Sequence, residues 1–321
     1  MKKLLDVITP DQMTPAAADD LQKAINQFLE SHDVRPQSRA TYQRNLKRFY
    51  EWFTLNGGTN PDQVTILKYK EHLQTLTSRA TGEGLSSLTV GGYLTTVRKF
   101  FEWCEAKKIY PNIARGVKNP KQKRTFKKSP LTAEQADELL QSIPRDDLEG
   151  LRDYALVNLL LRTGIRTIEA MRADIGDVHQ EGGCVKLLIQ GKGSDDKDDF
   201  VILTEKAHAP IRAYLAARTD RRNSNSPLFI SISNRNNGQR ITTRSISRIF
   251  KERLRAIGID DSRITAHSAR HTTATLALLG GAPIHQVQQT LRHASPNTTA
   301  IYAHVIDRIQ NAAEYYLDAA F

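Results

Sequence analysis

The sequence has few of the features of secreted or membrane-bound proteins. It contains only two cysteines, Cys104 and Cys184, whose spacing matches neither a metal site nor a disulfide scaffold. No run approaches the roughly 18 consecutive apolar residues that a membrane helix needs, and the N-terminal apolar run is too short for the centre of a signal peptide. These absences predict a cytoplasmic protein in a reducing compartment, with no membrane partner.

The sequence also lacks the spaced pairs of carboxylates with which metal-dependent nucleases hold Mg²⁺. One acidic cluster is present, but its members form a single run beside two lysines, and we interpret them as solvated loop charges. These are Asp195, Asp196, Asp198 and Asp199. The sequence therefore predicts no metal ion and no other cofactor.

Positive charge is abundant. The 321 residues include 46 Lys and Arg against 35 Asp and Glu, a formal net charge of +11. Nucleic acid is the first candidate partner, because Lys and Arg contacts release counterions from phosphates. The alternative is a basic protein whose charge serves only solubility.

The N-terminal part predicts a helical domain. Residues 1–16 show no periodicity and are interpreted as a flexible tail, and residues 17–114 carry apolar residues at helical spacing with no strand pattern. Four helices are expected, beginning near Asp19, Ser38, Val64 and Ser87, with Ser38 as a helix cap.

A basic segment follows, at residues 115–129. It contains seven basic residues and no acidic one, and Pro120 makes it a poor helix. We predict an extended linker between domains that lies along a DNA backbone; the alternative is a solvated linker. The basic residues are Arg115, Lys118, Lys121, Lys123, Arg124, Lys127 and Lys128.

Residues 130–321 predict a second domain in which helices dominate. Thr132 and Gln135 have the spacing of a capping box. Helices are expected at 132–143, 148–163, 207–219, 243–257, 266–279, 283–291 and 297–305 and in a C-terminal tail, and short strands at 175–178, 184–189 and 200–203. The predicted class is mainly α (α+β): a four-helix N-terminal domain and a helical domain with a small three-stranded antiparallel sheet.

Four segments of the second domain contain side chains suited to phosphate chemistry. Arg166 follows Thr-Gly, where a helix ends, and can present its guanidinium to a phosphate; the structural alternative is pairing with Glu169 or Asp174. Lys192 lies between two glycines in a predicted turn, and Lys197 is its rival.

The other two segments carry imidazoles, a guanidinium and a phenol. His267 and Arg270 are three residues apart and share a helix face, whereas the rival His271 lies about 100° around the helix from Arg270. His293 precedes Tyr302 by nine residues. A phenol has a pKa near 10, so it needs cationic neighbours or a base to act as a nucleophile. The alternative tyrosines, Tyr315 and Tyr316, are expected to pack on the tail helix.

Together these segments resemble the tyrosine recombinases, or phage-type integrases. The family pattern is T-G-x-R-x-x-E, a lysine in a strand–turn–strand, H-x-x-R, and a histidine nine residues before the nucleophilic tyrosine. The chain departs from it at Ala269, where leucine is usual, and at Arg292, where glycine is usual. The matching residues, in order, are Arg166, Lys192, His267, Arg270, His293 and Tyr302.

The resemblance covers almost the whole chain and implies the simple two-domain, Xer-like type. Residues 17–114 would be a SAM-like core-binding domain and residues 130–321 the catalytic domain. Tyr302 would attack DNA to give a 3′-phosphotyrosyl ester, without metal or ATP. Arg166, Arg270 and His293 would bind the phosphate oxygens. Lys192 would protonate the leaving 5′-oxygen, and His267 would help to take the tyrosine proton.

The implied partners are double-stranded DNA recombination sites and further copies of the chain. Strand exchange would pass through a Holliday junction within a homo-tetramer on DNA, and the chain would be a monomer in free solution. The tail near 309–321 would dock on a neighbouring subunit or, alternatively, on its own domain. From charge and helix face alone, the DNA contacts expected are Arg39, Arg44, Lys47, Arg98, Lys99, Lys118, Lys121, Lys123 and Arg124.

Three other functions remain as alternatives. A type IB topoisomerase shares the Tyr and Arg chemistry but relaxes supercoils as a monomer, and the separate N-terminal domain argues against it. A catalytically silent DNA-binding relative would not need the complete residue set. A metal nuclease would need carboxylates that the sequence does not supply.

Overall fold

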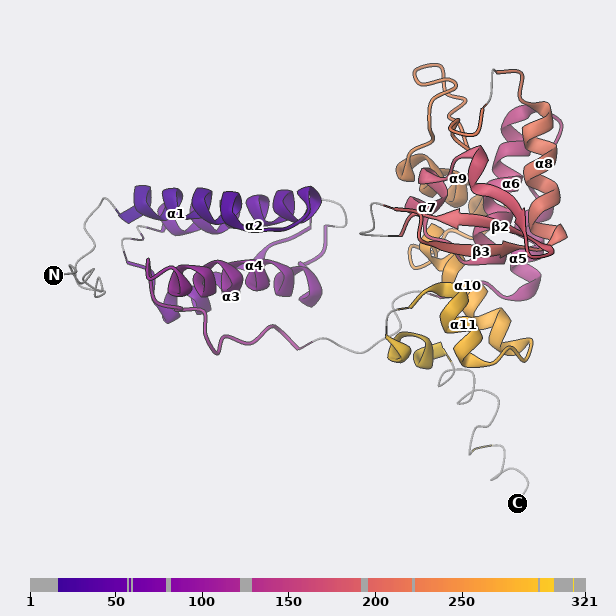
Figure 1. The fold of residues 1–321 in the computed structure, drawn as a ribbon. Helices are drawn as coiled ribbons and strands as arrows, with labels where there is room; N and C mark the ends of the chain where they lie inside the picture. The colour runs from indigo at the N-terminus through magenta and orange to yellow at the C-terminus, as the bar shows by residue number, and fades with distance from the viewer. Residues whose placement is uncertain are drawn as a thin grey trace. The chain divides into compact units, whose positions relative to one another are not determined.

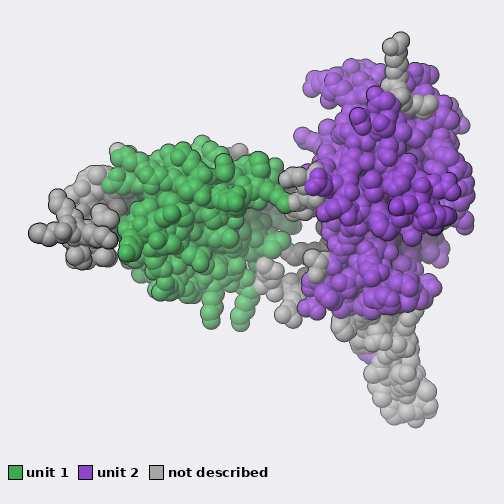
Figure 2. Space-filling model, in the orientation of Figure 1, with its two compact units in different colours: residues 1–125 green, residues 126–321 purple. Residues whose placement is uncertain are grey.

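The computed structural model describes residues 17–321 except 57, 59, 79–81, 122–128, 192–195, 221–222, 294, 303–313 and 315–321. Within this part of the chain the fold is mainly helical with one three-stranded antiparallel sheet, which confirms the predicted class (Figure 1). The chain divides into two compact units, residues 1–125 and 126–321 (Figure 2). The predicted N-terminal tail and most of the predicted C-terminal tail helix lie outside the described residues.

The first unit consists of four helices that meet in an aromatic core. The Phe49 ring is fully buried and lies edge-on to the rings of Tyr69 and Phe101, with centroids 5.0 and 6.1 Å away. Such edge contacts add to the stabilisation that burial of the rings provides. The helices are α1 (Ala17–Ser31), α2 (Pro36–Leu55), α3 (Gln63–Thr75) and α4 (Ser87–Ala106).

Helix α2 begins three residues earlier than the predicted cap at Ser38 would place it. Its first residue is Pro36, and the residue before it, Arg35, is the N-cap. Proline favours the first helical position because its φ is already helical and its missing N–H would have had no partner there. The prediction that Ser38 caps this helix was therefore wrong, since Ser38 lies inside the first turn.

The second unit is built around α6, which is buried on nearly all sides and packs against α5, α8 and α10. At α5, Gln135 N–H donates to Thr132 Oγ1 at 3.2 Å and Thr132 N–H donates to Gln135 Oε1 at 3.0 Å, which confirms the predicted capping box. The helices are α5 (Ala133–Gln141), α6 (Leu148–Thr163), α7 (Thr167–Arg172), α8 (Glu205–Ala217), α9 (Thr243–Ala256), α10 (Ala266–Leu279) and α11 (Ile284–Leu291), followed by helical residues 296–302.

The sheet has the order β1 (Val178–Glu181), β2 (Cys184–Ile189) and β3 (Asp199–Leu203). Leu187 of β2 pairs with Val178 on one side and Val201 on the other. Leu187 and Val201 are buried in the core, whereas Phe200 and Ile202 of β3 remain exposed. The two faces follow from the alternation of side chains along a strand.

Two short elements differ from the sequence prediction. The predicted strand 175–178 is largely a 3-10 turn, η2 (Ile175–Asp177), which is capped where Asp174 N–H donates to Asp177 Oδ2 at 2.7 Å. Helix α7 (Thr167–Arg172) was not predicted from the sequence. A six-residue helix has fewer than two turns, so its apolar residues cannot show helical periodicity.

Gly164 ends α6 and allows a close approach between α6 and α11. Its φ of 63° is left-handed, and a Cβ atom there would lie 2.5 Å from Leu291 Cδ2. We expect Gly164→Ala to lower the free energy of unfolding by more than the roughly 1–2 kcal/mol that the left-handed backbone alone costs. Chemical denaturation of the second unit would measure this loss.

Gly238→Ala is the matched control. Gly238 has a φ of 77°, but a Cβ atom there would meet nothing within 4 Å. It should therefore carry the backbone penalty without the clash. Equal losses for the two variants would show that the contact with Leu291 is easily accommodated.

Candidate active site

The predicted site residues of the second unit come from four places in the chain. Arg166 precedes α7, Arg270 lies on α10, His293 follows α11, and Tyr302 lies on the helix 296–302. Their charges interact: the pKa of His293 responds to Arg270 and Arg166, and that of Tyr302 responds to Arg270. The fold therefore brings these four residues into one cluster.

The Arg166 side chain is held by a buried carboxylate. Its Nη1 donates to Glu169 Oε1 at 2.8 Å and its backbone N–H donates to Oε2 of the same residue at 2.7 Å. The Glu169 side chain is completely buried, whereas that of Arg166 is 30% exposed. The carboxylate thus orients the guanidinium and leaves part of it open to a ligand.

Arg270 is buried and bonded to neutral partners. Its Nη1 donates to Gly164 O at 2.8 Å, and its Nη2 donates to Leu291 O. Burial, followed by the nearby guanidiniums of Arg166 and Arg292, lowers the Arg270 pKa to about 10. The side chain remains charged at neutral pH, and the carbonyl oxygens orient it without neutralising it.

Arg292 joins the same cluster, although sequence reasoning did not count it as a site residue. It adopts left-handed backbone angles of 52° and 49°, its Nη2 donates to Glu169 Oε2 at 2.5 Å, and its Nε lies 3.5 Å from Asp199 Oδ2. Glu169 is therefore shared by Arg166 and Arg292. The available signal was the position of Arg292 directly before His293.

His293 is neutral at physiological pH. Burial, and then the positive charges of Arg270, Arg166 and Arg292, lower its pKa to about 4. Its Nδ1 lies 2.8 Å from the hydroxyl oxygen of Thr299, a fully buried residue that sequence reasoning did not select. This contact fixes the direction in which the other ring nitrogen points.

Tyr302 is 5% exposed, and its hydroxyl forms a hydrogen bond with Nδ1 of His271. The Tyr302 ring also lies nearly parallel to that of His293, with centroids 6.5 Å apart and planes at 11°. Burial raises the phenol pKa, and Arg270 opposes this increase. The rival His271, which was ranked below His267 from the sequence, is therefore hydrogen-bonded to the phenol.

Lys192 lies outside the described residues, but the structure describes its rival. Lys197 Nζ donates to Asp174 Oδ2 at 2.7 Å and Asp177 Oδ2 at 2.6 Å. Burial works to lower the Lys197 pKa, but these hydrogen bonds outweigh it and hold the pKa above its ordinary value. Lys197 thus anchors the hairpin to η2 and is poorly suited to releasing a proton.

Comparison with known proteins identifies the family. Residues 129–308, more than half of the chain, match the model of the phage integrase family. The chain belongs to this family, the tyrosine recombinases. It is 32% identical over 282 residues to tyrosine recombinase XerC of Thermodesulfovibrio yellowstonii, covering 86% of each chain. It is 33% identical to tyrosine recombinase XerA of Pyrococcus furiosus, covering 82% of this chain and 84% of the other.

Solved structures share the fold. XerH recombinase in a post-cleavage complex with a palindromic difH substrate has a TM-score of 0.73 and 23% identity, covering 93% of this chain and 84% of the other. The Tn1549 transposon integrase in complex with transposon right end DNA has a TM-score of 0.69 and 16% identity, covering 92% and 99%.

The activity follows from the family. The recombinase catalyses site-specific DNA recombination by the tyrosine recombinase mechanism, as the curated relatives indicate. Of the functions considered from the sequence, this is the one that the comparisons support. Among the described residues, no group of three or more His, Cys, Asp or Glu side chains could hold a metal ion.

The predicted DNA-contact residues of the recombinase that the structure describes all lie in the first unit. Arg39, Arg44, Lys47, Lys99, Lys118 and Lys121 are exposed, and Arg98 is half-buried. The Arg98 guanidinium donates to Asn119 Oδ1 at 2.6 Å, which ties the start of the basic segment to α4. Lys123 and Arg124 lie outside the described residues.

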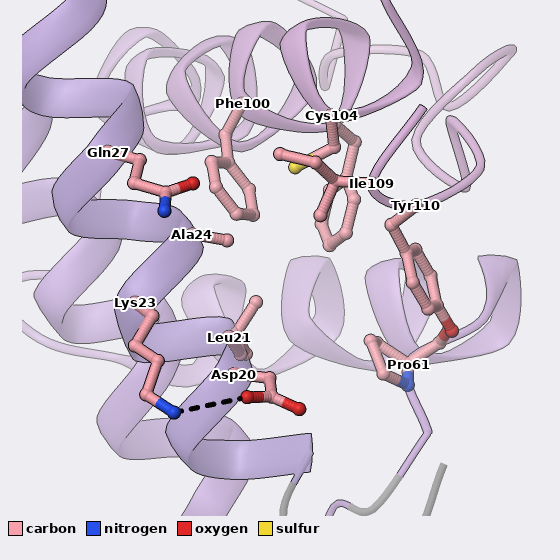
Figure 3. Close-up of a pocket in the computed structure, with 11 residues that line it drawn as sticks. Asp20, Leu21, Lys23, Ala24, Gln27, Pro61, Phe100, Cys104, Ile109 and Tyr110 are labelled. Carbon is pink, nitrogen blue, oxygen red and sulfur yellow. Dashed lines mark hydrogen bonds and ion pairs between the residues drawn. The ribbon is translucent and has the colours of Figure 1, made fainter. Parts of the chain in front are cut away.

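The first unit of the recombinase also contains a cavity of about 290 Å³ between α1, the end of α4 and residues 109–110 (Figure 3). None of the predicted catalytic or DNA-contact residues lines it. Burial raises the pKa of the Cys104 thiol in its wall to about 12, so the thiol stays protonated and unreactive.

In the part of the chain that the structure describes, no helix is long and apolar enough to cross a membrane.

The contribution of Arg292 to the charge of the site can be measured at His293. Because glycine tolerates the left-handed angles at position 292, Arg292→Gly removes the guanidinium while keeping the turn. We expect the His293 pKa to rise in this variant, as one of three nearby cations is lost. An NMR titration of the imidazole would measure it. Arg292→Lys keeps the charge and should stay close to wild type; an unchanged pKa in the glycine variant would contradict the assignment.

Stability should also depend on His293. Its folded pKa of about 4 lies below the ordinary 6.5, so the unfolded chain binds this proton first as pH falls. Its contribution to stability is complete above pH 6.5 and is lost as pH falls towards 4. We expect His293→Gln to flatten the pH dependence of the unfolding free energy in this window, and the exposed control His285→Gln to leave it unchanged. Identical curves for wild type and His293→Gln would contradict the prediction.

Proposed function

We propose that this chain cuts and rejoins double-stranded DNA at specific sites by attack of Tyr302 on a phosphodiester. The product of the first step would be a 3′-phosphotyrosyl ester and a free 5′-hydroxyl. The observation that carries the proposal is the clustering of the Tyr302 phenol with Arg166, Arg270 and His293. The proposed reaction uses no pair of carboxylates to hold a metal ion. The phosphotyrosyl ester conserves the bond energy that is needed for rejoining.

The two arginines would bind the non-bridging oxygens of the scissile phosphate. Arg270 supplies a buried, oriented positive charge whose described partners are carbonyl oxygens, and Arg166 offers the exposed part of its guanidinium. Donors fixed in advance in this way stabilise the charge that develops in the transition state without reorganising during the reaction.

His293 would act as a neutral hydrogen-bond donor to the same phosphate. If the Thr299 hydroxyl donates to Nδ1, the proton of the imidazole resides on Nε2 and can be donated to a phosphate oxygen. The low pKa of His293 supports this role, because the imidazole does not take up a second proton at neutral pH and so remains a neutral donor. Thr299 would then be a positioning residue that selects the tautomer.

The leaving 5′-oxygen needs a proton, and we assign this role to Lys192. The lysine that competes with it, Lys197, is held by Asp174 and Asp177, which supports the choice. His267 is the last member of the proposed catalytic set. Its ring lies beside that of His271, which bonds the phenol, with the two ring centroids 5.1 Å apart.

Double-stranded DNA is the proposed partner. XerH was solved with difH DNA and the Tn1549 integrase with transposon DNA, and both share this fold. We infer that residues 17–114 and the basic segment 115–129 contribute mainly phosphate contacts, with a few base contacts that choose the site. Strand exchange would take place in a homo-tetramer through a Holliday junction, with the segment after residue 308 docking on a neighbouring copy.

The test of this proposal is a covalent trap. A DNA duplex nicked close to the cut loses the short 5′-hydroxyl fragment, so the protein–DNA ester accumulates and is visible in a denaturing gel. We expect Tyr302→Phe to abolish the ester because the variant lacks the nucleophilic oxygen, while DNA binding in a gel-shift assay is retained.

The double variant Tyr315→Phe/Tyr316→Phe is the control. It removes the two other C-terminal phenols and should still form the ester. An ester that survives Tyr302→Phe and disappears in the double variant would transfer the nucleophile to the tail and refute the proposed site.

A further inference from the structure

We propose that His271 is a further catalytic residue, whose Nδ1 takes the proton of the Tyr302 hydroxyl during cleavage and returns it during rejoining. This inference rests on the proposed function of Tyr302 as the nucleophile. It replaces the expectation that His267 accepts this proton.

The position of His271 supports the inference directly. Its Nδ1 and the Tyr302 hydroxyl form a hydrogen bond, and the two ring centroids are 5.4 Å apart with the planes at 50°. A general base must lie within hydrogen-bond reach of the proton that it removes. His271 meets this requirement before any substrate binds.

The phenol needs such a base. Burial raises its pKa, and the opposing effect of Arg270 is smaller. Tyr302 is therefore protonated at neutral pH, and its oxygen is a weak nucleophile until the proton is removed. A positive charge alone, as supplied by the arginines, does not provide an acceptor for that proton.

The other imidazole that flanks the phenol is less suitable. His293 lies nearly parallel to the Tyr302 ring, but its Nδ1 contacts Thr299 and its pKa is about 4, so it is a weak base. His267 lies one helical turn before His271 on α10, and its ring meets the His271 ring edge-to-face at 88°. We infer that His267 supports the His271 ring.

The proposed step is balanced. As the Tyr302 oxygen bonds to phosphorus, its proton passes to Nδ1 of His271, and the phosphorus–5′-oxygen bond breaks. The leaving oxygen receives a different proton, from the acid that we assign to Lys192. In rejoining, the 5′-hydroxyl attacks the ester and its proton returns to the group that we assign to Lys192. The phosphorus–tyrosine oxygen bond breaks, and His271 gives its proton back to the departing phenolate oxygen.

The groups around His271 come from two parts of the chain. From α10 these are His267 and Arg270; from the following elements they are Tyr302 and, behind it, His293.

The experiment measures the rate of ester formation by the full-length protein on nicked DNA. At neutral pH we expect His271→Ala to be slower than wild type by about 10²–10⁴-fold, the usual contribution of general base catalysis. The difference in rate between His271→Ala and wild type should shrink as the pH rises towards the pKa of the phenol, because a phenolate needs no base. Gel-shift binding and thermal denaturation would show that the variant is folded, and the exposed His285→Ala should react like wild type.

His271→Asn separates proton transfer from positioning. The asparagine amide can keep a hydrogen bond to the phenol but cannot take up its proton, so it should be as slow as His271→Ala. Recovery of the wild-type rate and pH profile by His271→Asn would overturn the proposal and leave His271 as a positioning residue. A loss confined to His267→Ala, with His271→Ala reacting normally, would also overturn it.

A DNA substrate with sulfur in place of the bridging 5′-oxygen distinguishes the base from the acid. The thiolate leaves without protonation, so this substrate should rescue Lys192→Ala but not His271→Ala. Rescue of His271→Ala would overturn the proposal by showing that the residue assists the leaving group. If instead Tyr302→Phe forms the ester as wild type does, the proposed function itself fails, which is a separate result.

Discussion

The candidate site depends on one buried carboxylate. Glu169 has no exposed side-chain surface and accepts hydrogen bonds from the guanidiniums of both Arg166 and Arg292. A buried ion survives only when it is paired and fully hydrogen-bonded, so Glu169 holds α7 and the turn after α11 in a fixed relation. That relation places Arg166 and His293 close to Arg270 of α10.

The balance of charge explains the behaviour of the remaining groups. One carboxylate is shared by two guanidiniums, while the hydrogen bonds of Arg270 that we describe go to neutral carbonyl oxygens. Burial, and after it the excess positive charge, lowers the pKa values of Arg270 and His293, while the charge of Arg270 opposes the burial-induced rise at Tyr302. A phosphate would relieve this repulsion, so the energy stored between the cations favours binding of an anion and further negative charge in the transition state.

The sequence predicted what depends on local rules. The capping box at Thr132 and the bounds of α6 and α10 follow from residue type and helical spacing, and the family motif identified Arg166, Arg270, His293 and Tyr302 as a group. The choice between His267 and His271 could not be made in this way. Helix geometry relates each histidine to Arg270 on its own helix, but Tyr302 reaches α10 from a segment 31 residues further along the chain.

The segment between β2 and β3, which contains Lys192, shows a second limit of prediction from the sequence. Its two lysines look alike in the sequence, and only the contacts of η2 and α7 distinguish them. Lys197 is fixed by Asp174 and Asp177 after the turn, and Arg172 Nη1 donates to Gly191 O at 3.1 Å before it. Both ends of the turn are therefore attached to the segment that follows Arg166. If Lys192 delivers a proton to a phosphate bound by Arg166, as we propose, this attachment would help, because the segment that holds Gly191 and Lys197 follows directly after Arg166 in the chain.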